Sequence, residues 1–121
     1  MEMIKWYKYV VLQNYANFNG RASRSEFWWF VLANFIISFI LSFIDQIIGI
    51  QFFSTLYGLA ILIPGIAVSV RRLHDIGKSG WNLLWGLIPI IGAIILIIWY
   101  VKESDPEENQ YGPVPSTVPI E

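Results

Sequence analysis

The 121-residue sequence predicts an all-α membrane protein in which three transmembrane helices follow an amphipathic helix at the membrane interface. Two observations lead to this fold class. Hydrophobic residues make up 55% of the chain and charged residues only 14%, whereas soluble domains contain about 25% charged residues. The apolar residues are also concentrated in three long blocks, which is typical of membrane spans rather than of one globular core.

An amphipathic helix is the first predicted element, over residues 1–18. Apolar and aromatic side chains recur there at spacings of three and four residues and would share one face: Ile4, Tyr7, Val11, Tyr15 and Phe18. Such a helix suits the plane of the membrane interface, where its lysines would meet anionic lipid. The alternative is a helix packed on the bundle or on a partner.

Three apolar blocks follow, at about residues 27–48, 52–70 and 81–101. The first carries no charge over its first 18 residues, and the other two carry none. At about 1.5 Å per residue, each block as a helix is long enough for a hydrocarbon core of about 30 Å. We therefore expect three spans, with kinks at Pro64 and Pro89.

Local signals support the ends of these spans. Ser23 and Glu26 have the spacing of a capping box just before the first block, and Gly77 is a suitable stop after the second. Aromatic residues that favour the headgroup region gather at the ends of the first and third blocks: Trp28, Trp29, Trp81, Trp85, Trp99 and Tyr100.

The basic residues predict the orientation. Seven of the eight lysines and arginines precede the first block or lie between the second and third, and only Lys102 follows the third. By the positive-inside rule, the N-terminus and loop 71–80 are expected in the cytoplasm and, after three crossings, the C-terminus outside. Residues 103–121 are acidic, contain four prolines and are expected to form a disordered tail after a single membrane domain over residues 1–113.

The stretch RRLHDIGKSGW at residues 71–81 holds the only histidine of the chain among charged neighbours. One histidine without cysteine makes no zinc site, and no hydrolase triad is recognisable, so we expect no enzyme, metal or cofactor. The main interpretation is the polar collar of a membrane helix. A ligand or lipid-headgroup site is the alternative, and catalysis is least favoured. Together with a second patch before the first block, the candidate residues are Arg21, Arg24, Glu26, Arg71, Arg72, His74 and Asp75.

Each patch combines basic residues with one carboxylate, which suggests that the two patches meet and dock the helices. In this hypothesis each carboxylate faces arginines of the other patch: Glu26 against Arg71 or Arg72, and Asp75 against Arg21 or Arg24. The alternative is two independent, solvated collars.

Three stretches together resemble a known family. FNGRASRSEFWWF at residues 18–30, RRLHDIGKSGW at 71–81 and NQYGP at 109–113 match its signatures in order and spacing. The family is domain of unknown function 805, small inner-membrane proteins of bacteria. The resemblance implies a multi-pass protein of a bacterial plasma membrane without an established activity, and it favours docking of residues 109–113 on the bundle.

We therefore expect a non-enzymatic membrane component whose basic cytoplasmic face associates with anionic lipid headgroups, with a second copy or with another membrane protein. The net charge of −1 provides no basic field for nucleic acid. The alternative is a small oligomeric transporter or channel gated by the arginine, histidine and aspartate of the collar. Polar residues within the spans form only short rows, which indicate helix packing: Asn34, Ser38, Ser42, Gly65 and Ser69.

Overall fold

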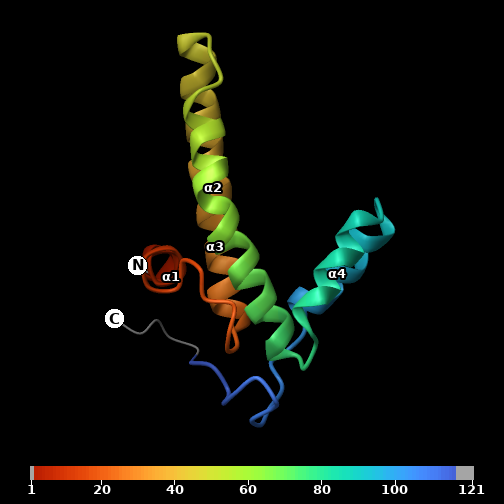
Figure 1. Cartoon of the computed structure of the whole chain (residues 1–121). Helices are drawn as coiled ribbons and strands as arrows, with labels where there is room; N and C mark the ends of the chain where they lie inside the picture. The colour runs from red at the N-terminus through yellow and green to blue at the C-terminus, as the bar shows by residue number, and fades with distance from the viewer. Residues whose placement is uncertain (1, 117–121) are drawn as a thin grey trace.

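The computed structural model describes residues 2–116 and is built from helices (Figure 1). Two long antiparallel helices form an upright hairpin, a short N-terminal helix lies across it, and a second, shorter hairpin leans away from its base. In chain order the elements are α1 (Glu2–Lys8), the π-helical turn η1 (Tyr9–Gln13), α2 (Arg24–Ile48), α3 (Phe53–Asp75), the 3₁₀ helix η2 (Gly80–Leu87) and α4 (Ile91–Val101).

The long hairpin of α2 and α3 contains the first two predicted spans. The helices have 25 and 23 residues, and both are long and apolar enough to cross a membrane. Only 17% of the most apolar stretch of each helix is buried inside the molecule, whereas the core helix of a soluble protein would be mostly buried. These exposed apolar faces therefore suit contact with lipid, and α3 continues beyond the predicted end at residue 70 to Asp75.

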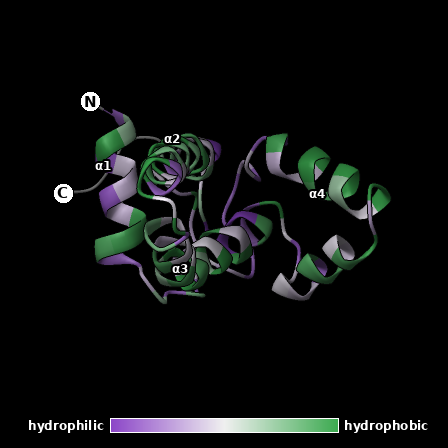
Figure 2. Ribbon diagram, turned by 90° about the horizontal axis from the view of Figure 1, so that it is seen from above, coloured by the Kyte–Doolittle hydropathy of each residue, from purple (hydrophilic) through white to green (hydrophobic). Residues whose placement is uncertain are grey.

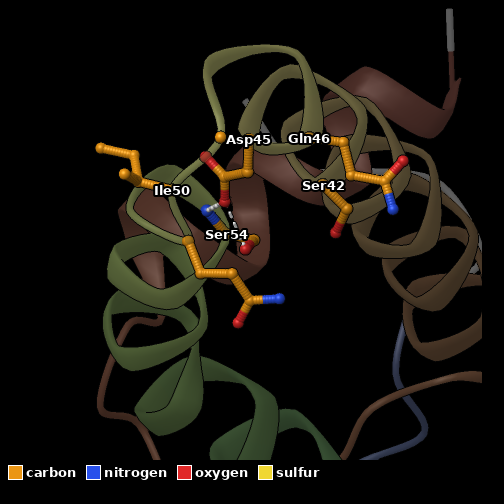
Figure 3. Close-up of a pocket in the computed structure, with 7 residues that line it drawn as sticks. Ser42, Asp45, Gln46, Ile50 and Ser54 are labelled. Atoms are coloured by element: carbon orange, nitrogen blue, oxygen red, sulfur yellow. Dashed lines mark hydrogen bonds between the residues drawn. The ribbon is translucent and has the colours of Figure 1, made fainter.

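Side chains and loop residues fix both ends of this hairpin. Ser23 caps α2 by accepting a hydrogen bond from the backbone N–H of Glu26 at 3.1 Å, as its spacing predicts. At the opposite end, Asp45 of α2 accepts from the N–H groups of Phe53 and Ser54 at 3.0 and 2.9 Å, so it caps α3 (Figure 3). Gly77, with a φ of 78°, ends α3 in a Schellman motif.

The third apolar block does not form one helix. It folds back on itself as η2 and α4, which lie side by side and lean away from the α2–α3 pair, with η2 in contact with α3 (Figure 2). Pro89 lacks a backbone N–H, and Ile90 adopts a φ of 67°, so a helix cannot continue through these two residues. The structure therefore does not confirm a single spanning helix over residues 81–101, because a count of apolar residues does not distinguish one long helix from two short ones.

The turn of this second hairpin satisfies its own backbone groups. Ile88 donates to the carbonyl of Trp85 at 3.0 Å, and Gly92 donates to the carbonyl of Ile88 at 3.0 Å. The two legs also approach closely, since a Cβ added at Gly92 would collide with the carbonyl oxygen of Trp85. Because the chain reverses here, Lys102 returns to the end of the molecule where η2 began.

Helix α1 and η1 pack on the long hairpin through a face that overlaps the predicted one only in part, since Tyr7 and Val11 belong to both. Trp6 and Val10 are buried, whereas Ile4 and Tyr15 of the predicted apolar face are exposed. The ring of Tyr7 stacks on Phe30 of α2 at 5.8 Å between centroids. The predicted helix over residues 1–18 is also shorter in the structure, where η1 ends it at Gln13.

The acidic segment after α4 has a defined course as far as residue 116. The N–H of Asp105 donates to the carbonyl of Asp75 at 3.0 Å, and Asn109 and Gly112 close a tight turn with two backbone hydrogen bonds. The structure therefore does not confirm the expected disorder for residues 103–116. Residues 117–121 of the predicted tail lie outside the described part of the chain.

Candidate functional site

The seven candidate residues lie together at the base of the α2–α3 hairpin. Six of them are buried, with at most 9% of the residue exposed, and only Arg24 is exposed. The segment after α4 packs against them. We call the seven residues together with segment 102–113 the polar clasp.

Arg21 is the most highly connected residue of the polar clasp. Its Nε donates to Oδ1 of Asp75 at 3.0 Å, and its four other N–H groups reach backbone carbonyls. A guanidinium has five N–H donors, so all of them are used. The acceptors belong to the end of α3 and to three tail residues: Asp105, Glu107 and Gly112.

Asp75 is the carboxylate at the centre of this network and is fully buried. Besides Arg21, it accepts from Nη1 of Arg72 at 2.7 Å and from the hydroxyl of Ser104. The loop before α2, the end of α3 and the tail thus share one carboxylate. An aspartate buried with two arginines is stabilised only while these partners stay in place.

Arg72 and Arg24 provide the C-terminal cap of α4. Nε of Arg72 donates to the carbonyl of Tyr100 at 3.1 Å, and its Nη2 donates to the carbonyl of Lys102. Nη1 of Arg24 donates to the carbonyl of Val101 at 3.2 Å. The last carbonyls of a helix have no partner within it, so two cations here satisfy hydrogen bonds and the helix dipole together.

Glu26 and Arg71 form the second ion pair, between Oε2 and Nη1, and both are 2% exposed. Nε of Arg71 donates to the carbonyl of Asn17 at 3.1 Å, which ties the loop before α2 to α3. Nη2 of Arg71 and Nε1 of Trp6 are buried and have no acceptor within residues 2–116. The two patches therefore meet, as the balance of their charges predicts.

His74 contacts both the loop before α2 and the tail. Its Nδ1 lies 3.0 Å from the carbonyl oxygen of Gly20, which can only accept, so this nitrogen donates. The ring of Tyr111 stacks on the imidazole at 3.8 Å with an interplanar angle of 1°. Asn109 donates to the carbonyl of His74 at 2.9 Å, and within the described residues no group of three or more metal-ligating side chains is present.

Among the buried side chains of the polar clasp, the charges nearly balance. Three buried arginines and two buried carboxylates leave one formal positive charge, as three minus two. The C-terminal ends of α3 and α4 both meet in the clasp, and each is equivalent to about −0.5 charge. A cavity of about 300 Å³ borders the clasp between α1 and the tail and is lined in part by Trp6, Glu26 and Tyr111.

Comparison with known proteins shows that the chain belongs to a family. The model of the family described as protein of unknown function (DUF805) matches residues 15–113. Inner membrane protein YhaH of Escherichia coli (strain K12) is 42% identical over 120 residues, which cover 94% of this chain and 98% of the relative. Inner membrane protein YhaI of the same strain is 41% identical over 112 residues, or 90% and 93% of the two chains. No solved structure matches significantly. The resemblance to this family, which the three signatures suggested, is thereby confirmed.

Residues of all three signatures meet in the polar clasp. The candidate residues named from the sequence left out several contacts of the clasp, which come from backbone carbonyls or from a single hydroxyl: Asn17, Tyr100 and Ser104. Asn109 and Tyr111 belong to the stretch for which the family resemblance favoured docking on the bundle. The stretch NQYGP was the one available signal for the tail. What the clasp binds beyond the chain itself stays a prediction.

Proposed function

Because the chain belongs to the DUF805 family, we propose that it is a non-enzymatic inner-membrane protein that gathers anionic lipid at its cytoplasmic face. The names of its relatives YhaH and YhaI support the location. The two long apolar helices support an anchor that crosses the bilayer.

The observation that carries the proposal is the position of the cations. No lysine or arginine occurs between Arg24 and Arg71, so the loop between α2 and α3 has none. All eight basic residues belong to the half of the molecule that holds the polar clasp. The positive-inside rule favours the cytoplasm for this half. Since the tail returns to the clasp, this orientation puts both ends of the described chain in the cytoplasm. This proposal replaces the expectation from the sequence that the C-terminus lies outside.

Seven of the eight basic residues fall into two classes with different roles, whereas Lys78 is half-buried and lies over the ring of Trp99. Arg21, Arg71 and Arg72 are buried and paired, so they stabilise the fold and do not reach headgroups. Four others are exposed on the same half: Lys5, Lys8, Arg24 and Lys102. Each exposed cation near an anionic membrane surface contributes about 1 kcal/mol of attraction.

Both buried carboxylates of the polar clasp are already paired with arginines, which argues against catalysis. Asp75 accepts three hydrogen bonds, and Glu26 is held by Arg71. A general acid or base needs access to the reacting proton of a substrate. Each of these carboxylates instead has a partner whose loss would leave a buried charge.

Lipid selectivity tests the proposal. The full chain is placed in flat bilayers, and electron paramagnetic resonance compares the association of spin-labelled phosphatidylglycerol with that of phosphatidylcholine. We expect a preference of about two- to threefold for phosphatidylglycerol, lost in high salt. The variant K8Q/K102Q should reduce the preference towards one, while the control E107Q/E108Q should preserve or increase it. A ratio of one for the unmodified chain would contradict the proposal.

A further inference from the structure

We propose that the protein is a wedge across the bilayer and concentrates where the leaflet around the polar clasp is convex. The partner is therefore a curved lipid surface. The assignment of this leaflet to the cytoplasm rests on the proposed function, but the wedge itself does not.

The two hairpins have different depths. α2 and α3, with 25 and 23 residues, are about 37 and 34 Å long at 1.5 Å per residue. η2 has 8 residues and α4 has 11, which give about 16 Å each at about 2.0 and 1.5 Å per residue. The hydrocarbon core is about 30 Å thick, so the second hairpin reaches about half of it. Figure 1 shows its tip far below the loop between α2 and α3.

The base of the short hairpin is fixed at the clasp end. Nε1 of Trp28 and Nε of Arg72 both donate to the carbonyl of Tyr100, at 3.0 and 3.1 Å. At the start of η2, the Nζ of Lys78 lies 4.6 Å from the centroid of the Trp99 ring. The start of η2 and the end of α4 therefore lie at the same level, beside the polar clasp. The hairpin cannot shift toward the other leaflet without breaking these contacts.

The surface of the short hairpin requires an apolar environment. Its tip and both legs expose large aliphatic side chains, with Leu87 79% and Ile90 76% exposed. Within residues 80–101 no charged side chain occurs. Acyl chains of the clasp-side leaflet provide that environment at the depth where the hairpin lies.

Helix α1 adds to the same leaflet. It lies across the lower half of the long hairpin, on the side away from α4 (Figures 1 and 2). Trp6 and Val10 face the bundle, and Lys5 and Lys8 are exposed. A helix inserted in the interface plane responds to curvature, because it fills space between headgroups of one leaflet only.

The resulting shape is asymmetric. The clasp-side leaflet contains parts of α1, α2, α3, η2 and α4, whereas the other leaflet contains only α2 and α3. Each helix with its side chains is about 10 Å wide, so the two leaflets hold unequal protein areas. A leaflet that is convex has extra area at its headgroups, and it accommodates the larger end with less compression of lipid.

Sorting into membrane tubes tests this inference. The chain has no cysteine, so the exposed Glu108 replaced as E108C gives a single dye site at the clasp end. The labelled full chain is reconstituted in giant vesicles, tubes are pulled outward, and an impermeant quencher reports which molecules have the clasp outside. Clasp-outward molecules should be enriched in the tube at least about twofold, or about 0.4 kcal/mol as RT ln 2, and clasp-inward molecules should be depleted.

The opposite orientation is the matched control, since the same molecule is measured in the same tube. Equal densities of labelled protein in the tube and in the vesicle would overturn the wedge. Enrichment of both orientations, or depletion of both, would also overturn it. Enrichment that vanishes at low protein density would also overturn it, because assembly of several copies would then be the cause. The orientation is read from the clasp end, so failure of lipid selectivity or of the cytoplasmic assignment leaves this outcome unaffected.

Discussion

The Nε of Arg21 lies 3.0 Å from Oδ1 of Asp75, although 54 residues separate the two in the chain. Both side chains are almost fully buried, at 1% and 0% exposure. This contact joins the loop before the first span to the end of the second, and the other donors of Arg21 join both to the tail. The fold of a small membrane protein thus depends on a polar network at one end.

Replacement of Arg21 by lysine should destabilise the protein although the charge is kept. Lysine has three donors in place of five and lacks the planar fork, so at least two hydrogen bonds are lost. We expect a decrease of about 2 kcal/mol in the free energy of unfolding, measured by denaturation in detergent. The exposed Lys8, changed to arginine, is the control and should stay within about 0.5 kcal/mol. An unchanged R21K variant would refute the role of the network.

The pairing of Glu26 is specific for one of two neighbouring arginines. A double-mutant cycle of Glu26→Gln with Arg71→Gln should show a coupling of about 2 kcal/mol, because the two side chains form a buried pair. The same cycle with Arg72→Gln should show less than about 0.5 kcal/mol, since Arg72 pairs with Asp75 instead. Equal couplings in both cycles would mean that the pairing differs in solution.

Release of the tail should follow from loss of the Tyr111 ring. Its stacking on His74 is worth about 1 kcal/mol, so Tyr111→Ala should raise the population with a detached tail by about fivefold. Limited proteolysis of the full chain measures this as a faster cleavage near residue 108. Tyr111→Phe keeps the ring and should behave like the unmodified chain. Equal cleavage rates for all three would show that stacking does not hold the tail.

The close approach of η2 and α4 makes Gly92 a sensitive position. An alanine there would place a Cβ against the carbonyl oxygen of Trp85, and we expect a loss of about 1–3 kcal/mol from overpacking. At Gly58 an added Cβ meets open space, so Gly58→Ala is the matched control and should not destabilise. The melting temperatures of the two variants measure the difference, and a G92A variant as stable as G58A would contradict the hairpin geometry.

The sequence alone was sufficient for the parts of the fold that depend on composition and on local signals. Long uncharged blocks predicted the bodies of α2 and α3, and the spacing of Ser23 and Glu26 predicted the start of α2. The charge balance of two patches predicted that Glu26 and Asp75 meet arginines of the other patch. These inferences need only hydrophobic length and the cost of an unpaired buried charge.

The remainder required three-dimensional information. The block over residues 81–101 is as apolar as a span, and only the combination of Pro89, Ile90 and the capping of α4 by Arg72 shows the reversal. The tail is acidic and rich in proline, which is typical of disorder, yet its carbonyls accept from Arg21. Hydrogen bonds to backbone carbonyls leave no compositional signal in the accepting segment.

The reversal at Pro89 is tested most directly by labelling single cysteines in intact cells. The native chain has no cysteine, so Gln51→Cys in the loop between α2 and α3 and Glu108→Cys in the tail each provide one site. With a membrane-impermeant maleimide, we expect labelling of Q51C from outside and labelling of E108C only after the inner membrane is opened. Labelling of E108C in intact cells would show that residues 81–101 cross the membrane and would contradict the hairpin.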